Sequence, residues 1–316
     1  MELVFNELSL RDPSDSVIVA RQRMCDLVFV IRDYYQQRLG RDLRVSDNFI
    51  YEFIGKDYKI IQWLNDQEVD IELKRFFKAS ITRKPYIDPH MESHLYSSFQ
   101  SSEFQYKELK SKGLGIAYLL NGTSISLQSN EEWNSHSISL SFVELDQDGE
   151  IYEDTVSIRH ISNITHINIH KPYYDQLKKI KFNDLEWRNN LEQLFPSLVF
   201  CDRAIAQLFE FQKGELILGQ IKNKLIELNE YFDAWDDGGF KSEVIASKVT
   251  PESQRTLEQF AKEHTFLCPD GEYRVFSWHL RMTPGAGRIF FIPEEKTRKC
   301  IIGHIGNKLK TVNDRT

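Results

Sequence analysis

Three stretches near the end of the chain decide how it is interpreted: GEYRVFSWHLRM at 271–282, GRIFFIP at 287–293 and KCIIGHIGNKL at 299–309. Each is rich in β-branched and aromatic residues, and the first alternates apolar with polar side chains, as half-buried strands do. Turn-forming segments, TPGAG at 283–287 and EEK at 294–296, lie between them. The pattern predicts an antiparallel sheet in which 273–281 and 288–292 are neighbouring strands.

The segments before these strands complete a domain. SLVFCDRAIAQLFEF at 197–211 is typical of a short strand that runs into a helix, and LILGQIKNKLIELNEYF at 216–232 of an amphipathic helix. Thr250-Pro251-Glu252 places a proline at the first turn of another expected helix, which ends near residue 264. The predicted order is one strand, two or three helices and then three strands.

This order and its residue patterns resemble the RelE/ParE toxin superfamily, small bacterial proteins of which many are messenger-RNA endonucleases. LVFCDRAIAQL resembles the opening strand and its entry into the helices, and the three stretches quoted first resemble the closing strands. The resemblance covers about 197–312 and implies an α/β sandwich with an antiparallel sheet that acts on RNA. The chain departs from the family in the extra helix at 250–264 and in the 195 residues that precede the domain.

The N-terminal part has a different pattern. Helical spacing predicts one helix over 16–39, capped by Asp15, and another over about 46–79 with a break near Gly55. From Gly113 onward, a period of two predicts an antiparallel meander of about four strands in GIAYLL, SISLQS, HSISLSFVEL and DTVSIRHIS, with turns at Asn121-Gly122 and Asp148-Gly149. A further helix is expected over 183–195. The sequence thus predicts an α+β protein of two domains: residues 1–182, with helices and a β-meander in a regulatory or docking role, and residues 183–316, RelE-like.

Composition limits the classes of function. The net charge is −7, but nine Lys/Arg and only three Asp/Glu lie between Tyr273 and the C-terminus, so phosphates would be attracted there rather than elsewhere. No run of 18 apolar residues and no signal-peptide pattern is present. The four cysteines are scattered and form no CxxC pair, which favours a reducing cytoplasm. We therefore expect a cytoplasmic protein that does not contact membranes.

Strand alternation sorts the basic residues of the C-terminal sheet. Phe276, Trp278 and Leu280 are expected on the core side, with Tyr273 and the basic residues on the other. RNA cleavage by the neighbouring 2′-hydroxyl needs a proton acceptor, a proton donor and fixed cations, which His, Arg and Lys supply. The predicted catalytic residues are His279, Arg281, Arg288, His304 and Lys308. The predicted nucleic-acid-binding residues are Arg274, Arg298, Lys299 and Lys310.

Other residue patterns offer weaker alternatives. His160, His166 and His170 fall within 11 residues and could ligate a metal from one face of a strand or loop. Arg159-x6-His166 and Arg83-x6-His90 have the spacing of the Arg and His pair in HEPN-type ribonucleases. His90 and His94 lack the glutamate of an HExxH motif, and no phosphate-binding glycine loop is present. The sequence therefore predicts neither a metal nor a cofactor.

Two functions from different classes stay open. The first is a regulated, toxin-like effector of a bacterial defence or toxin–antitoxin type system that cleaves RNA, free or ribosome-bound, without a metal. The second is a non-enzymatic subunit of a defence complex, whose basic sheet holds a protein or nucleic-acid partner.

Overall fold

The chain consists of two compact units that combine helices and strands. The computed structural model describes residues 1–82, 84–88, 90, 92–145, 151–180, 186–211, 216–245, 247–282 and 287–312. Unit 1 is Met1–Lys178 and unit 2 is Lys179–Thr316, so the division falls just before the boundary suggested by the sequence at 182/183. No helix in these described stretches is both long and apolar enough to cross a lipid bilayer.

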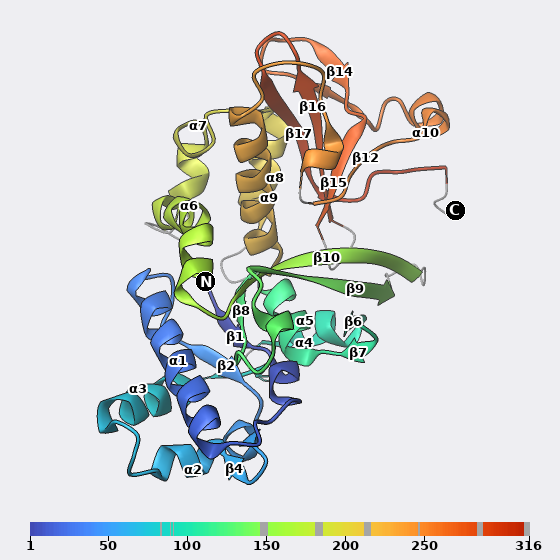
Figure 1. The fold of residues 1–316 in the computed structure, drawn as a ribbon. Helices are drawn as coiled ribbons and strands as arrows, with labels where there is room; N and C mark the ends of the chain where they lie inside the picture. The colour runs from blue at the N-terminus through green and yellow to red at the C-terminus, as the bar shows by residue number, and fades with distance from the viewer. Residues whose placement is uncertain are drawn as a thin grey trace. The chain divides into compact units, whose positions relative to one another are not determined.

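Unit 1 is built on a mixed eight-stranded sheet (Figure 1). Its parallel part runs, in spatial order, through β5 (Lys84–Pro85), β2 (Leu43–Val45), β1 (Leu3–Phe5), β8 (Thr123–Ile125) and β10 (Ile151–Ile161). Antiparallel strands continue it: β9 (Ser137–Leu145), β6 (Ser102–Tyr106) and β7 (Leu109–Lys110). Every residue of β1, β2 and β8 is buried, as expected where a parallel sheet is covered on both faces.

The predicted N-terminal meander is therefore only partly right. The β9–β10 hairpin exists, although its turn at Asp148-Gly149 lies outside the described residues. GIAYLL instead belongs to helix α5 (Lys112–Leu119), and β8 pairs with β1 and β10 in parallel. The apolar residues of α5 are buried on nearly every side, and a fully buried helix shows no helical period from which it could be recognised.

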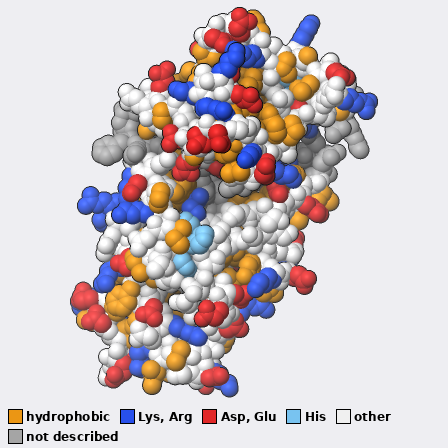
Figure 2. Space-filling view, turned by 45° about the horizontal axis from the view of Figure 1, so that its top comes forward, with side chains coloured by type: hydrophobic (Ala, Val, Ile, Leu, Met, Phe, Trp, Pro, Cys, Tyr) orange, Lys and Arg blue, Asp and Glu red, His pale blue; other side chains and the backbone are white. Residues whose placement is uncertain are grey.

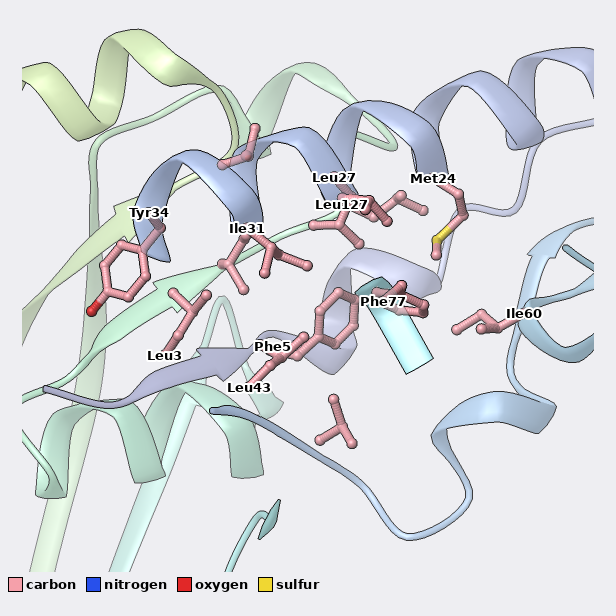
Figure 3. Close-up of a cluster of buried hydrophobic side chains, with 14 of the residues drawn as sticks. Leu3, Phe5, Met24, Leu27, Ile31, Tyr34, Leu43, Ile60, Phe77 and Leu127 are labelled. Carbon is pink, nitrogen blue, oxygen red and sulfur yellow. The ribbon is translucent and has the colours of Figure 1, made fainter. Parts of the chain in front are cut away.

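The first predicted helix is confirmed as α1 (Val17–Gln36), with Ser16 rather than Asp15 as its N-cap. Figure 3 shows Met24, Leu27 and Ile31 of α1 above Phe5 of β1 and Leu43 of β2. The helical stretch predicted over 46–79 is only partly right: its second half forms α2 (Ile60–Asn65) and α3 (Ile71–Ile81), but the first half contains the short strands β3 (Phe53–Gly55) and β4 (Tyr58–Lys59). Helices α4 (Ser93–Gln100) and α6 (Ile164–Ile180) complete the unit.

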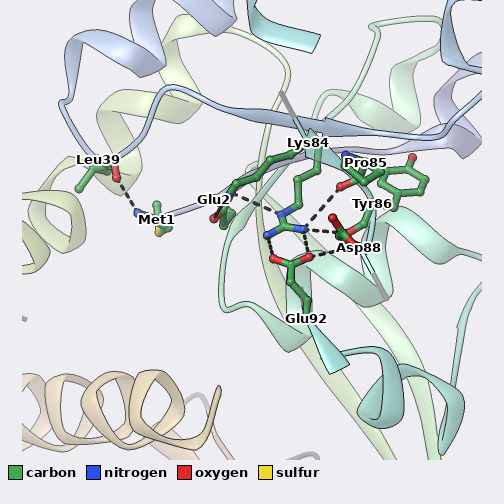
Figure 4. A network of polar contacts seen from close by, with 9 residues as sticks. Met1, Glu2, Leu39, Lys84, Pro85, Tyr86, Asp88 and Glu92 are labelled. Carbon is green, nitrogen blue, oxygen red and sulfur yellow. Dashed lines mark hydrogen bonds and ion pairs between the residues drawn. The ribbon is translucent and has the colours of Figure 1, made fainter. Parts of the chain in front are cut away.

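A buried arginine ties together one edge of this sheet (Figure 4). Arg44 on β2 is 1% exposed, and its guanidinium contacts both oxygens of Glu92, at 2.8 and 2.5 Å. It also donates to the carbonyl of Tyr86, beyond β5, and lies 3.4 Å from Glu2. Burial raises the pKa of Glu92, but Arg44, the Asp88 amide and Lys84 together hold that pKa below its usual value. The ionised pair therefore fixes the edge strand β5 and the segment after it against β2.

We expect Ser111→Ala to lower the free energy of unfolding of unit 1 by about 1–2 kcal/mol. Ser111 is 3% exposed and caps α5, since its Oγ accepts from the Leu114 amide and donates to Glu7. The matched control is Ser16→Ala, which removes the solvent-exposed N-cap of α1 and should cost less. Urea titration of both variants compares them; equal losses would contradict a special role for the buried cap.

Unit 2 contains a five-stranded sheet in the order β11 (Leu198–Phe200), β17 (Lys299–Asn307), β16 (Gly287–Glu294), β15 (Trp278–Met282) and β12 (Val249–Pro251). β11 is parallel to β17, and the other neighbours are antiparallel. Helices α8 (Asp202–Glu210) and α9 (Leu216–Asp233) follow β11, in the order that the sequence predicted, and both contact β17. Of the helix expected over 183–195, the described part is a 3-10 turn (Glu186–Asn190) followed by α7 (Leu191–Leu194).

Two expectations for unit 2 are only partly right, although the predicted antiparallel pairing of β15 with β16 is confirmed. The strand predicted over 273–281 is divided, because β14 (Tyr273–Val275) pairs with β13 (Thr265–Leu267) in a separate hairpin, and only β15 joins the main sheet. The helix expected over 250–264 is only α10 (Gln254–Gln259), and Pro251 belongs to the edge strand β12. An edge strand tolerates proline because its outward side needs no amide donor.

The two faces of this sheet are packed differently. On one face, Trp278 and Phe291 contact Phe240, and Phe291 also contacts Phe232 of α9. On the other face, the β13–β14 hairpin contributes Phe266 to a cluster with Phe276 and Phe290. Phe276 and Trp278 thus lie on different faces of the sheet, contrary to the predicted alternation. The reason is that the strand is interrupted between β14 of the hairpin and β15 of the main sheet.

Candidate functional site

The register of the five-stranded sheet brings the predicted histidines into one row. His279 on β15 lies directly opposite Phe290 on β16, and Phe290 lies opposite His304 on β17. Directly opposite residues in a sheet share a face, so both histidines project to the side away from α9. Arg281 and Arg288 form the next row on this face, directly opposite one another. We call the side chains of these two rows, together with Lys308, the polar face.

His279 is held by two neighbours that belong to β12 and the residue after it. Its Nε2 lies 3.0 Å from the Thr250 hydroxyl, and its Nδ1 lies 3.2 Å from the Glu252 carboxylate. Burial lowers the pKa of His279 to about 3, and the positive charges of Arg288, Arg281 and Lys308 add to this effect. His279 is therefore neutral near pH 7; its Nε2 is hydrogen-bonded with the Thr250 hydroxyl, while its Nδ1 lies near the Glu252 carboxylate without a hydrogen bond to it.

His304 is more deeply buried, at 4% exposure. Its Nε2 donates to the carbonyl of Asn307 at 2.9 Å, and its Nδ1 accepts from the Gln207 amide of α8 at 3.0 Å. The ring is stacked with Phe266 of the hairpin, with 6.0 Å between the centroids. Burial lowers the pKa of His304 to about 4. Both ring nitrogens are thus engaged within unit 2.

Arg281, Arg288 and Lys308 place three positive charges in this neighbourhood. Arg288 is 8% exposed and donates to the Gly287 carbonyl at 2.9 Å, whereas Arg281 is half-buried. Lys308 follows the end of β17 and is exposed, yet its charge acts on His279 together with both guanidiniums. All five predicted catalytic residues therefore belong to one neighbourhood, in which cations rather than accessible proton donors predominate.

The predicted nucleic-acid-binding residues do not form one surface. Arg274 is on the β13–β14 hairpin, where it forms an ion pair with Asp270. Arg298 and Lys299 lie at the other end of β16 and β17 from Arg288; Lys299 is opposite Glu294, and Arg298 donates to the Gly238 carbonyl at 2.6 Å. Lys310 follows β17, where its carbonyl accepts from His264. Of these four residues, only Lys310 lies within two positions of a residue of the polar face, Lys308.

Sequence reasoning missed three residues of this neighbourhood. Thr250 and Glu252 contact His279, and His264 lies with its ring centroid 5.2 Å from that of Phe290. The first two fall in the segment that was predicted as a helix start, where their pairing with a distant strand leaves no local signal. His264 precedes β13, and its ring lies beneath the hairpin that covers part of the face.

The histidines of unit 1 do not make a metal site. His160 lies near the end of strand β10, whereas His166 and His170 are on helix α6. The prediction that all three share one face of a strand or loop is therefore wrong. Their ring nitrogens are occupied: those of His160 contact Ser126 and Ser135, those of His166 contact Ser162 and Asn163, and Nε2 of His170 contacts the carbonyl of His136. Among the described residues, no group of three or more His, Cys, Asp or Glu side chains is placed to hold a metal ion.

The HEPN-type pairs also find no support in the geometry. Arg159 is on a strand, where it lies over the Tyr173 ring at 3.9 Å and donates to Asn121, while His166 contacts Ser162 and Asn163. Arg83 lies outside the described residues, and so does the side chain of His94; His90 is in an exposed turn.

On the face of the molecule seen in Figure 2, Lys and Arg side chains are interspersed with Asp and Glu rather than gathered into a broad basic area. Comparisons with protein-family models, with curated proteins and with solved structures found nothing that matches this chain.

Proposed function

We propose that unit 2 binds the phosphate backbone of RNA at the polar face, as the RNA-directed module of a toxin-like effector in a bacterial defence or toxin–antitoxin type system. The observation that carries the proposal is the direct opposition of Arg281 and Arg288, with Lys308 acting on the same neighbourhood. A phosphate placed between two facing guanidiniums can accept hydrogen bonds from both of them. The planar guanidinium also matches a phosphate in two-point contact.

Metal-independent cleavage would follow from the same geometry, with His279 rather than His304 as the proton-transfer group. His279 is less buried than His304, and it lies closest in the sheet to both arginines. A phosphate bound between Arg281 and Arg288 would place a negative charge beside the imidazole and raise its pKa from the resting value of about 3. His279 could then accept the 2′-hydroxyl proton, while the guanidiniums stabilise the charge that develops on phosphorus.

A specific observation favours a second candidate, a non-enzymatic subunit that binds a partner through the same face. Both nitrogens of His304 are hydrogen-bonded inside unit 2, and both histidines are neutral and largely buried. Binding through the cations requires neither histidine to be released, whereas catalysis requires His279 to leave Thr250 or Glu252.

The decisive experiment incubates the purified chain with labelled single-stranded RNA, with and without ribosomes and a chelator. Chelator-resistant cleavage that leaves 2′,3′-cyclic phosphate ends is the expected result for the enzyme. Salt-sensitive binding with intact RNA would establish the second candidate instead. Neither binding nor cleavage, under any of these conditions, would contradict both.

For unit 1 we propose a regulatory or docking role; among its described residues, no group of His, Cys, Asp or Glu side chains is placed to hold a metal ion. Limited proteolysis should cut the chain between about residues 172 and 197 and leave two folded fragments. RNA cleavage by the N-terminal fragment alone would show that this division of roles is wrong.

A further inference from the structure

A cavity of about 240 Å³ lies in unit 1 at the carboxyl ends of two parallel strands. Of the residues that line it, Ser46, Asp47 and Asn48 directly follow β2, and Tyr86 and Ile87 directly follow β5. β2 is parallel to both β1 and β5, so these segments leave the sheet at the same end. The crevice beyond the carboxyl ends of parallel strands is where open α/β sheets bind their ligands.

The charged side chains that line this cavity are not engaged by the protein. Asp47, Glu52 and Lys112 are exposed, and in the described part of the chain no hydrogen bond or ion pair involves their charged groups. The carboxamide of Asn48 does not cap the 3-10 turn that follows it. These groups are therefore available to a ligand.

The start of α5 contributes Lys112 to the cavity but offers no anion site of its own. The carboxylate of Glu7 accepts from the amides of Lys112 and Gly113, at 2.6 and 2.9 Å. It also accepts from the Ser111 hydroxyl at 3.2 Å, so the amides that could hold an anion at this helix start already have one. The lining thus combines one lysine with two acidic residues, a formal charge of −1, which disfavours a phosphate-rich ligand.

Size and hydrogen-bonding capacity limit the ligand further. Pockets for drug-sized ligands have volumes of about 300–1,000 Å³, so this cavity suits a molecule of amino-acid size. Carboxylates only accept hydrogen bonds and an ammonium group only donates them, so the ligand needs donors for one part of the lining and an acceptor for the other. Tyr86 is 3% exposed, and its hydroxyl donates to the Phe5 carbonyl, so its ring gives a nucleobase no open surface for stacking.

We propose that this cavity binds a basic α-amino acid of the arginine or lysine type. The cationic groups of the ligand contact Asp47 and Glu52, and its carboxylate contacts Lys112. Ser46 and Asn48 supply further hydrogen bonds. Exposed ion pairs are individually weak, so we expect a Kd on the order of 0.1–1 mM. Such a site would give unit 1 a small-molecule input that is separate from the RNA binding proposed for unit 2.

The test measures binding of L-arginine and related probes to the full chain by ligand-observed NMR at low salt. L-Citrulline replaces the guanidinium of arginine with a neutral urea group, and agmatine lacks the carboxylate. Each should bind about 5-fold more weakly than arginine or worse, because each loses one set of ion pairs. L-Glutamate, whose side-chain charge is reversed, should not compete with arginine.

Two variants assign the contacts. Glu52→Gln should weaken arginine binding by about 5-fold. Lys112→Met should remove the preference for arginine over agmatine, and α5 should stay intact because Glu7 is bonded to the Lys112 amide rather than to its side chain. Glu68→Gln is the matched control, since it makes the same change at an exposed carboxylate of unit 1 outside the cavity, and it should bind arginine as the wild type does.

The wild-type measurements decide the matter even if a variant fails to fold. Equal binding of arginine and citrulline, displacement of arginine by glutamate, or binding of adenosine in place of arginine would overturn the proposal. So would the absence of arginine binding at about 10 mM, well above the expected Kd. Unchanged arginine affinity in both Glu52→Gln and Lys112→Met would place the binding elsewhere and end the assignment.

Discussion

Replacing Arg281 with alanine is expected to lower RNA affinity, and cleavage where it occurs, by about 10²-fold, with little change in stability. Arg281 is half-buried at the end of β15, so its loss leaves no large cavity. If it contacts one phosphate, the slope of log affinity against log salt concentration should become shallower by about 0.7. Fluorescence titration with single-stranded RNA at several salt concentrations measures both quantities.

Lys299→Ala provides the matched control for this prediction. It removes one positive charge from the same sheet, at the end of β17 that lies away from Arg288. Its affinity and salt slope should stay close to those of the wild type. Arg281→Lys should recover only part of the loss, because an ammonium group cannot make the two-point contact. An equal loss in Arg281→Ala and Lys299→Ala would reduce the effect to net charge, and no loss in either would end the proposal.

The sequence could predict the rows of the polar face because strand alternation is a local property. His279 and Arg281 are two residues apart on β15, and the antiparallel pairing of β15 with β16 sets Arg281 opposite Arg288, as the pattern indicated. What it could not predict is the covering of that face. Phe266 belongs to the β13–β14 hairpin and His264 directly precedes it, and the packing of this hairpin on the sheet depends on contacts between residues far apart in the sequence. His304, which was expected at a surface, is therefore buried beneath the hairpin.

Unit 1 shows a second limit of periodicity. Strands β1, β2 and β8 are three residues long and wholly buried, so neither length nor alternation distinguishes them from the ends of helices. Their parallel pairing joins Leu3 with Leu43 and with Thr123. These residues are far apart in the sequence, and a pattern within a short segment cannot predict which distant strands pair. By contrast, α1 was predictable because its buried residues recur at helical spacing behind a good N-cap.

Lowering the pH from 7 to 5 is expected to destabilise unit 2 by up to about 4 kcal/mol, because His279 and His304 are neutral in the folded state. Their folded pKa values of about 3 and 4 lie below the ordinary value of 6.5. The unfolded chain therefore binds protons first, and stability that is complete above pH 6.5 falls as the pH drops toward 4. At pH 5 each histidine contributes about 2 kcal/mol to this loss, at about 1.36 kcal/mol per unit.

The charges that surround each ring determine how much of this loss is observed. Arg288, His264, Arg281 and Lys308 oppose a charged His279, which lies beside the Glu252 carboxylate; because its folded pKa is the lower of the two, its contribution should be at least as large as that of His304. Arg203 and His264 oppose a charged His304, and none of its hydrogen-bond partners is a carboxylate. The window between pH 6.5 and 5 also lies above the range in which the paired carboxylates, such as Glu92, take up protons.

Urea unfolding of the wild type, His304→Gln and His90→Gln at pH 7 and pH 5 tests this expectation. Glutamine cannot take up a proton in this range, so His304→Gln should start less stable at pH 7 and lose about 2 kcal/mol less than the wild type on acidification. His90 lies in an exposed turn of unit 1, and its replacement should leave the pH dependence of unit 2 unchanged. Because both measurements use differences within one variant, the cost of losing the ring contacts at His304 cancels. Equal pH dependence in His304→Gln and the wild type would show that His304 is not held neutral in the folded protein, and would remove the argument that its nitrogens are committed to the fold.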